Sequence, residues 1–365
     1  MVLDQYFARI RPLDKLKDDH SVRLGLFGEV GSVLTTAKKK NREGMSYDYQ
    51  GAITEELGDA IWYFFRLVDR LGFSISDLMP SQFWAERVSL ILATDNPQSP
   101  VAQAPVTNDL DLPIVLSELG RSAAKLLDDA LGDAGAVKTQ LQEFFDNYLK
   151  TLQATGISFS EVLKNNLMKT EGRFIFPDFA TLPRFDSEFE PDERLPEHFE
   201  IHVVERSNGK SYLKWNGVLV GDPLTDNIEG EDGYKFHDVF HMAHAAILHW
   251  SPTFRALIRH KRKSDPKYDE QQDGGRAIVI EEGLTAWIFS NAKHAELFQG
   301  RDNLSFDLLK GIKQFVTGYE VQECPLWLWE KAILDGYGVF RELKEYRSGV
   351  IIGDREKRSI EYKRG

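Results

Sequence analysis

Three acidic side chains near the start of the sequence have the residue types and spacing of a divalent-cation site. Glu56 and Asp59 lie three residues apart in an apolar stretch, so a helix would place both on one edge of its buried face. Glu29 lies on the flank of another expected apolar helix face. If these two helices pack antiparallel, the three carboxylates converge beside the core.

Converging carboxylates repel one another unless a cation compensates them. Magnesium fits this role because it prefers hard oxygen ligands and also binds substrate phosphates. Such a site can activate water and neutralise charge during cleavage of a phosphoanhydride. The alternative is a solvated acidic helix edge that binds nothing. The spacing of Glu56 and Asp59 does not by itself decide between the two.

A histidine stripe in the last third of the chain indicates a second metal site. His237 and His241 are four residues apart, and two imidazoles at this helical spacing can bind one transition metal. Glu282, expected on another helix, could complete the site. The alternative is a set of half-buried histidines bonded to Glu282 and to backbone carbonyls. Further candidates in this region are a third histidine and four carboxylates: His244, Asp226, Asp238, Asp273 and Glu281.

The elements that must position these residues are mainly helices. Apolar periodicity predicts helices at 3–10, 21–40, 51–71, within 114–169, and at 234–250, 277–297, 304–316 and 327–346. Two strand-like runs, 199–205 and 211–220, flank a Ser-Asn-Gly turn. Residues 176–196 read as irregular, and the charged end, 356–365, as frayed. We therefore expect a mainly α protein, with a helical bundle followed by an α+β domain containing a small β-hairpin.

The helical half contains a repeat. Gly72 and Gly156 lie 84 residues apart, and each is followed by hydrophobic-Ser-hydrophobic-Ser-acid-hydrophobic. Duplication would give two units packed as a pseudo-dimer, whereas chance likeness of two helical hairpins is the alternative. The predicted division is a first unit at 1–92, a proline-bearing linker at 93–112, a degenerate second unit at 113–176, and a C-terminal domain at 190–365.

The N-terminal half resembles the MazG-like all-α nucleoside triphosphate pyrophosphohydrolases. The resemblance rests on GLFGEVG at 25–31, EELGDAIW at 55–62 and RLGFSISDL at 70–78, and extends more faintly over 112–174. It implies a helical bundle that cleaves the α–β phosphoanhydride of an NTP or dNTP with Mg²⁺, giving a monophosphate and pyrophosphate. The C-terminal region resembles the domain attached to some MazG-like proteins, which implies no particular activity.

The resemblance is incomplete in the metal pattern. The family's Glu-x-x-Asp matches Glu56 and Asp59, but its Glu-Glu-x-x-Glu matches only at Glu29, because Gly28 and Ser32 replace the other two acids. Three outcomes stay open: a single magnesium ion, loss of turnover, or a replacement ligand such as Glu55 or Asp48.

The resemblance also implies nucleotide or phosphate contacts from the last helix of a unit. The second unit has Asn166, Lys169 and Arg173 there, whereas the first has Gln82 and Ala85 at the positions of Asn166 and Lys169. We therefore hypothesise a divided site, with the metal-binding and catalytic acids Glu29, Glu56 and Asp59 from one unit and phosphate contacts from the other. A solvated helix end is the alternative for the cations.

Bulk composition sets further limits. The formal net charge of −12 argues against a nucleic-acid-coating surface, and the only cysteine, Cys324, excludes an intrachain disulfide and favours a reducing compartment. No run is long enough to span a bilayer, so we expect a cytoplasmic, soluble chain that could form homo-oligomers. The basic run at 255–263 could hold an anion or form a solvated cationic face.

These expectations leave three functions open. The first is the pyrophosphohydrolase. The second is a nucleotide-binding sensor with weak or no turnover, coupled to a C-terminal effector or metal-binding domain. The third is a chain in which both halves are active, the C-terminal half as a metal-dependent hydrolase.

Overall fold

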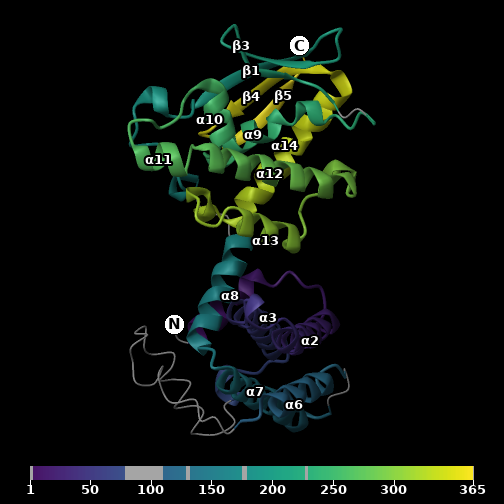
Figure 1. Cartoon of the computed structure of the whole chain (residues 1–365). Helices are drawn as coiled ribbons and strands as arrows, with labels where there is room; N and C mark the ends of the chain where they lie inside the picture. Colours follow the sequence, from purple (N-terminus) through teal and green to yellow (C-terminus); the bar gives the residue numbers. More distant parts are fainter. Residues whose placement is uncertain (1–2, 79–109, 129–131, 175–178, 227–228, 365) are drawn as a thin grey trace. The chain divides into compact units, whose positions relative to one another are not determined.

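The structure is a computed structural model that describes residues 3–78, 110–128, 132–174, 179–226 and 229–364. The chain divides into two compact units, Met1–Phe174 and Ile175–Gly365 (Figure 1). From here on these are called the first and the second unit, and both predicted repeats lie in the first. Helices make up most of the described residues, and the second unit adds one antiparallel sheet. The expected mainly α architecture with a C-terminal α+β domain is therefore confirmed.

The first unit is all helical. Its helices are α1 (Leu3–Ile10), α2 (Asp19–Glu43), α3 (Tyr49–Arg70), α4 (Ile75–Leu78), α6 (Leu112–Lys125), α7 (Ala134–Thr155) and α8 (Phe159–Phe174). Helices α2 and α3 pack as one hairpin and α6 and α7 as another, while α8 lies against α1 and α3. The predicted helices at 21–40 and 51–71 begin two residues earlier, because the side chains of Asp18 and Asp48 cap the exposed backbone N–H groups.

Helices α3 and α7 have matching ends. Each spans 22 residues and begins after an aspartate that caps its first turn, Asp48 or Asp133. After each helix a glycine adopts a left-handed conformation, with φ of 79° at Gly72 and 72° at Gly156. The residue after each glycine donates its backbone N–H to the carbonyl oxygen five residues earlier, so the same hydrogen bond closes the end of both helices. The linker predicted at 93–112 falls mostly outside the described residues.

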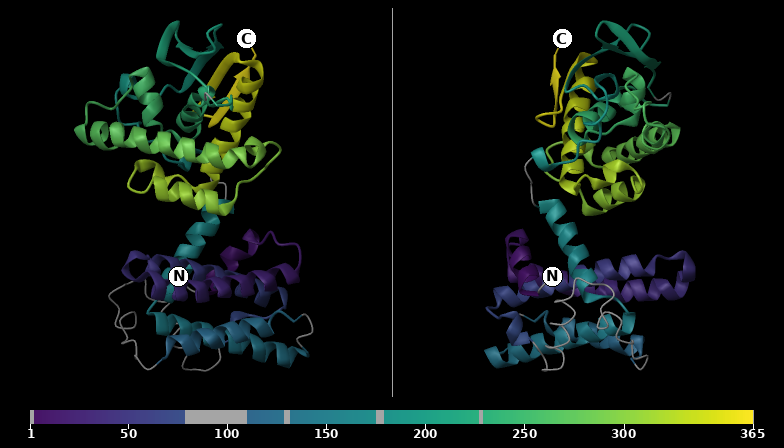
Figure 2. Two further views of the ribbon diagram at one scale, coloured as in Figure 1. Left: turned by 45° about the vertical axis from the view of Figure 1, so that its right-hand side comes forward. Right: turned by 90° about the vertical axis from the view of Figure 1, so that its left-hand side faces the viewer.

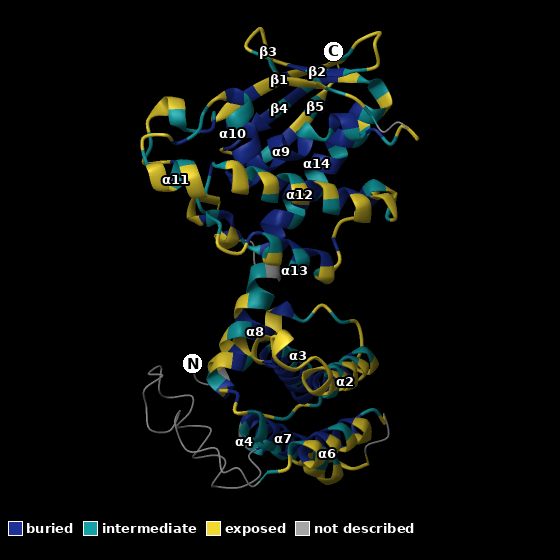
Figure 3. Cartoon of the chain, in the orientation of Figure 1, coloured by how far each residue is buried: buried dark blue, intermediate teal, exposed yellow. Residues whose placement is uncertain are grey.

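The core of the first unit joins the two hairpins through aromatic rings. Phe64 of α3 packs against Phe144 and Phe145 of α7, with ring centroids 4.6 and 5.8 Å apart. The buried Tyr148 hydroxyl donates to the Leu57 carbonyl at 2.9 Å. These contacts make the two hairpins one folded body, and the buried residues line the helix faces between them (Figure 3).

The sheet of the second unit has the order β3-β2-β1-β4-β5, all antiparallel. Its strands are β1 (His198–Glu205), β2 (Ser211–Trp215), β3 (Val218–Leu224), β4 (Ser348–Asp354) and β5 (Ser359–Lys363). Along β1, exposed and buried residues alternate, so one face of the sheet packs on the core. Figures 1 and 2 show the helices of this unit gathered on one side of the sheet.

Two predictions about the strands are wrong. The run 211–220 is two strands, because Asn216 and Gly217 both adopt positive φ and reverse the chain between β2 and β3. The end at 356–365, expected to be frayed, instead forms β5, and Ile360 is buried. Pairing with β4 satisfies the backbone of β5, which overrides the charged local composition.

Six α-helices of the second unit are described: α9 (Asp238–Ala243), α10 (Pro252–Ile258), α11 (Pro266–Gln271), α12 (Gly275–Lys293), α13 (Phe306–Phe315) and α14 (Leu326–Tyr346). The single helix predicted at 234–250 is wrong. A 3-10 turn at Tyr234–Phe236 precedes α9, and a π-helical turn at His244–Leu248 follows it. His249 then takes a left-handed conformation, which ends the helix.

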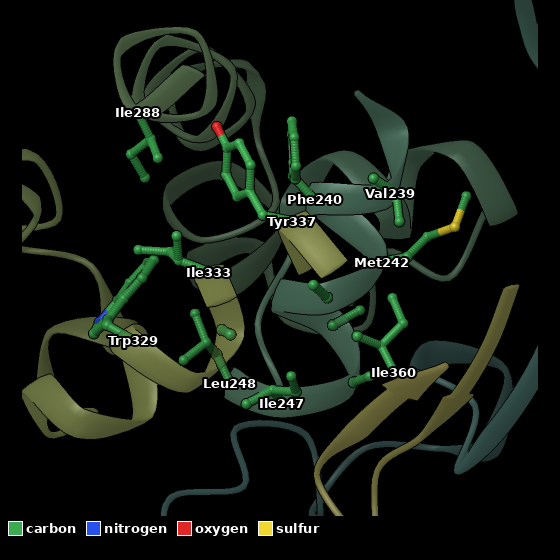
Figure 4. Packing of buried hydrophobic residues seen from close by; sticks show 14 of the residues in the cluster. Val239, Phe240, Met242, Ile247, Leu248, Ile288, Trp329, Ile333, Tyr337 and Ile360 are labelled. Atoms are coloured by element: carbon green, nitrogen blue, oxygen red, sulfur yellow. The ribbon is translucent and has the colours of Figure 1, made fainter. Parts of the chain in front are cut away.

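Helices α9 and α14 form the centre of the second core (Figure 4). Phe240 stacks on Tyr337 with ring centroids 4.4 Å apart, and Figure 4 shows Met242, Ile247 and Ile360 among the side chains of the same cluster. Among the helices that the structure describes, none combines the length and apolar composition needed to cross a membrane.

The basic run at 255–263 is a solvated cationic face only in part, because Arg259 and Lys263 are exposed whereas Arg255 and Arg262 are buried. Arg262 pairs with Asp273 at 2.7 Å and Glu320 at 2.6 Å, and Arg255 pairs with Asp186 at 2.6 Å. Asp186 lies in the irregular segment after the first unit, so this network fixes that segment to the domain. Buried charges of this kind require such partners.

The glycine turn after α7 predicts a pair of opposite stability effects. Gly156→Ala should lower the free energy of unfolding by about 1–2 kcal/mol, because φ is positive there. Gly31→Ala, at an exposed position inside α2 with open space around the new Cβ, should raise it by about 0.5–1 kcal/mol. Urea unfolding of the full chain measures both, and a stabilising Gly156→Ala would contradict the assigned turn.

Candidate functional site

Helices α2 and α3 bring the three predicted acids together. Glu29 projects from α2, and Glu56 and Asp59 from α3, with one carboxylate oxygen of each within 4.8 Å of the others. All three are half-buried. The cause is local, since each acid adjoins residues that anchor its helix in the core, such as Val30, Leu57 and Ala60.

This arrangement is electrostatically costly. Burial, and then the neighbouring carboxylates of Asp59 and Glu56, raise the pKa of Glu29 from 4.5 to about 7, although Lys169 opposes the shift. The cluster therefore resists carrying three negative charges near neutral pH without a compensating cation.

Helix α8 supplies one such cation and an amide. The Lys169 ammonium lies 2.6 Å from Asp59 Oδ2 and 3.1 Å from Glu55 Oε1. Asn166 Nδ2 donates to Asp59 Oδ1 at 3.1 Å. Burial alone would lower the pKa of Lys169, but Asp59 and then Glu55 raise it, so the ammonium stays charged.

Tyr6 belongs to this site, although residue spacing did not predict it. The buried Tyr6 hydroxyl donates to Asn166 Oδ1 at 2.6 Å, and Asn166 in turn donates to Asp59. Burial, and then the Asp59 charge, raise the pKa of Tyr6 well above its usual value, so it remains a donor. This relay fixes the orientation of Asp59. One signal was available: a Cβ at Gly58 would lie 3.0 Å from Asn166 Cβ, so the glycine allows α8 to approach α3.

The other suggested ligands are not in the acidic cluster. Asp48 caps α3 by accepting from the Gly51 N–H, and Glu55 pairs with Lys169. Arg173 lies in α8, but its side chain, like Gln82 and Ala85, is outside the described residues.

The second hairpin has no equivalent cluster among the residues that the structure describes. The positions that correspond to Glu29, Glu56 and Asp59 are Glu118, Gln140 and Glu143. Lys125 Nζ lies 2.6 and 2.8 Å from the two oxygens of Glu143, so that carboxylate is neutralised within its own hairpin.

The acidic cluster fits magnesium. Its donors are three carboxylates, which are hard oxygen ligands, and their mutual repulsion would be relieved by a divalent cation. Glu29, Glu56 and Asp59 are the residues that would hold it.

The second unit brings its predicted residues together as well. His237, His241 and Glu282 form one group with ligand atoms within 4.8 Å, and His241, His244 and Glu281 form another. Burial would lower the pKa of His241, but Glu281 and then Glu282 raise it to about 10. Of the further candidates, Asp226 accepts from the Gly233 N–H and Asp273 is engaged by Arg262, and neither belongs to these groups.

The structure thus defines a class of protein: an all-α unit with a convergent carboxylate cluster, followed by an α+β domain with a His/Glu cluster. The family model of the MazG C-terminal domain matches residues 180–365, half of the chain, and the chain belongs to this family. Comparison with curated proteins and with solved structures gave no match.

The raised pKa of Glu29 generates a stability prediction. Glu29→Gln should stabilise the metal-free protein by about 1 kcal/mol, allowing for partial solvent screening, because it removes one repelling charge. The gain should be present at about pH 8 and vanish below about pH 4, where Glu29 is protonated in both folded and unfolded states. The stabilisation of the wild type by Mg²⁺ should also be lost.

Thermal unfolding with EDTA or with Mg²⁺ measures these effects. Glu118→Gln is the matched control, since Glu118 belongs to no cluster in the described part of the chain, and it should leave the Mg²⁺ effect intact. A Glu29→Gln protein that still gains the wild-type stability from Mg²⁺ would exclude Glu29 as a ligand.

Proposed function

We propose that the chain is a magnesium-dependent nucleoside triphosphate pyrophosphohydrolase, converting an NTP or dNTP into a monophosphate and pyrophosphate. The observation that supports this most directly is the convergence of Glu29, Glu56 and Asp59 beside a cation, Lys169, from another helix. Membership in a MazG-related family is consistent with a nucleotide substrate. The carboxylates favour a metal, and the ammonium favours an anionic ligand next to it.

Each residue has a distinct part in this proposal. Glu29, Glu56 and Asp59 hold the metal, which when bound would neutralise phosphate charge and make a water molecule more acidic. Lys169 is the residue placed to pair with a phosphate oxygen, by exchanging one of its two carboxylate partners. Asn166 and Tyr6 are positioning residues, because they hold the Asp59 carboxylate in one orientation.

We also infer that the first unit is a tandem repeat with a divided site. The equal lengths, aspartate caps and glycine ends of α3 and α7 support a duplication. In that interpretation α2 and α3 keep all three acids, whereas the second copy has Gln140 at the position of Glu56 and contributes α8 instead. The Lys125–Glu143 pair is consistent with a copy released from metal binding.

One sequence feature favours the rival function, a nucleotide-binding sensor. Gly28 and Ser32 stand at positions where a second metal would need acidic ligands, so turnover could be weak even where nucleotide binds.

The pyrophosphohydrolase proposal also includes a cytoplasmic location, homo-oligomer formation and the absence of a nucleic-acid partner. The single cysteine supports the cytoplasmic location, and the net charge of −12 supports the absence of a nucleic-acid partner.

Pyrophosphate release from a panel of NTPs and dNTPs with Mg²⁺ tests the proposal. Glu56→Gln and Lys169→Ala should each lower kcat/KM at least about 100-fold, because one removes a metal ligand and the other the phosphate contact. Glu143→Gln, the counterpart of Asp59 in the second hairpin, should retain wild-type turnover. Tight nucleotide binding without pyrophosphate release would favour the sensor, and full turnover by Lys169→Ala would refute the divided site.

The relay through Asn166 generates a separate prediction. Tyr6→Phe should raise the Mg²⁺ concentration needed for half-maximal turnover about tenfold, with a smaller effect on kcat at saturating metal, because it only orients Asp59. Tyr148→Phe is the control, since it removes an equally buried hydroxyl whose acceptor is a helix carbonyl. Equal effects of the two variants on Mg²⁺ dependence would show that Tyr6 acts only through stability.

A further inference from the structure

The second unit contains a fully buried histidine whose ring has no hydrogen-bond partner. His241 of α9 is 0% exposed, and neither of its ring nitrogens makes a hydrogen bond. Nδ1 lies 3.1 Å from Glu281 Oε1 and Nε2 lies 3.3 Å from Glu282 Oε1, but the alignment required for hydrogen bonds is absent. A buried polar ring left in this state is costly unless another group satisfies it.

The neighbouring His237 has its proton assigned by its partner. His237 Nδ1 lies 2.8 Å from the Tyr234 carbonyl oxygen, and a carbonyl can only accept, so Nδ1 carries the proton. In the neutral ring Nε2 is then a lone pair, and it lies 3.6 Å from Glu282 Oε2. The Nε2 lone pair and the Glu282 carboxylate then face each other, which is the arrangement of two ligands that share a cation. A ring N–H held by a backbone carbonyl is also the usual support of a metal-binding histidine.

Glu281 is committed to structural partners. Its Oε2 accepts from the Ser251 hydroxyl at 3.0 Å and from the Thr253 N–H at 2.9 Å, and its Oε1 accepts from His244 Nδ1 at 2.9 Å. The Glu281 carboxylate is therefore held in place 3.1 Å from His241 Nδ1, and Nε2 of His241 lies on the side of Glu282. Glu282 has no comparable set of backbone or hydroxyl donors among the described contacts.

We propose that His237 Nε2, His241 Nε2 and the Glu282 carboxylate bind one divalent transition metal, of which zinc is the representative ion. Ligand atoms on a tetrahedral zinc ion with bonds of about 2.1 Å lie roughly 3.4 Å apart. His241 Nε2 lies 3.3 Å from one Glu282 oxygen and His237 Nε2 lies 3.6 Å from the other, so each nitrogen is close to this spacing from the carboxylate, and one ligand atom of each residue lies within 4.8 Å of the other two. This site lies in the C-terminal domain and is independent of the function proposed for the first unit.

The exposure of the ligands indicates that the metal would keep an open position. Glu282 is 40% exposed and His237 13%, whereas His241 is fully buried, so the site opens towards solvent on the Glu282 side. Two histidines and one glutamate leave the fourth tetrahedral position for water or a small ligand, as in hydrolytic rather than structural zinc sites. The π-helical turn directly after α9 fits this assignment, because such turns are frequent at functional sites.

The main alternative is an ion pair without metal, in which a protonated His241 lies between Glu281 and Glu282. Zinc binding to the full chain distinguishes the two. Calorimetric titration would use the Glu56→Gln protein in millimolar Mg²⁺, so that the acidic cluster of the first unit takes up no zinc. We expect one equivalent of Zn²⁺ to bind, and His237→Gln and Glu282→Gln each to weaken the affinity at least about 100-fold.

The variants are chosen to keep the fold. Both retain the buried His241 and Glu281, and circular dichroism before and after titration checks that each is folded. His202→Gln, at an exposed position on β1, is the control and should leave the affinity unchanged. The proposal is overturned if no zinc binds at micromolar concentration, if His237→Gln and Glu282→Gln bind as tightly as the parent, or if only His244→Gln abolishes binding.

Discussion

Repulsion between carboxylates held close together in a partly dehydrated place is the constraint on which the N-terminal unit depends. Glu29, Glu56 and Asp59 are fixed on two packed helices and cannot separate without disrupting the core. Burial and the neighbouring charges make full ionisation of the cluster unfavourable. Lys169 compensates one part of it, and a divalent cation would compensate the rest. The cluster is thus poised to bind positive charge, whatever reaction follows.

The same principle organises the second unit with different residues. Asp186, Asp273 and Glu320 are satisfied by Arg255, Arg262 and Arg355, with short contacts that leave little for another ligand. Glu281 and Glu282 instead face histidines, whose charge and lone pairs depend on what they bind. Arginine remains charged under all ordinary conditions, whereas imidazole can accept a proton or a metal ion. The arginine network is therefore structural, and the histidine group is the one able to bind a metal.

Each of the two units contains a group of titratable side chains next to buried residues that hold one of them in place. Asp59 is held by Asn166 and Tyr6, and His241 lies 3.1 Å from Glu281, which Ser251 and Thr253 hold in place. Asn166 and Tyr6 are more deeply buried than Asp59, whereas His241 is as fully buried as Glu281. Such supports set geometry, and geometry decides metal affinity more than the identity of the ligands alone.

Local sequence determined the helices of the first unit, their caps and the pairing of Glu56 with Asp59, because helical periodicity and capping depend on residues a few positions apart. It also placed His237 and His241 four residues apart, although His237 precedes α9 and only His241 lies within it. Only the tertiary structure decided that Tyr6 reaches Asn166, that Lys169 meets Asp59, and that Glu281 accepts a hydrogen bond from His244. It likewise turned the charged C-terminal end into a strand, since β4 offers hydrogen bonds that no local pattern reveals. Contacts between residues more than a hundred positions apart depend on how whole elements pack, and the spacing of residues along the chain does not contain that information.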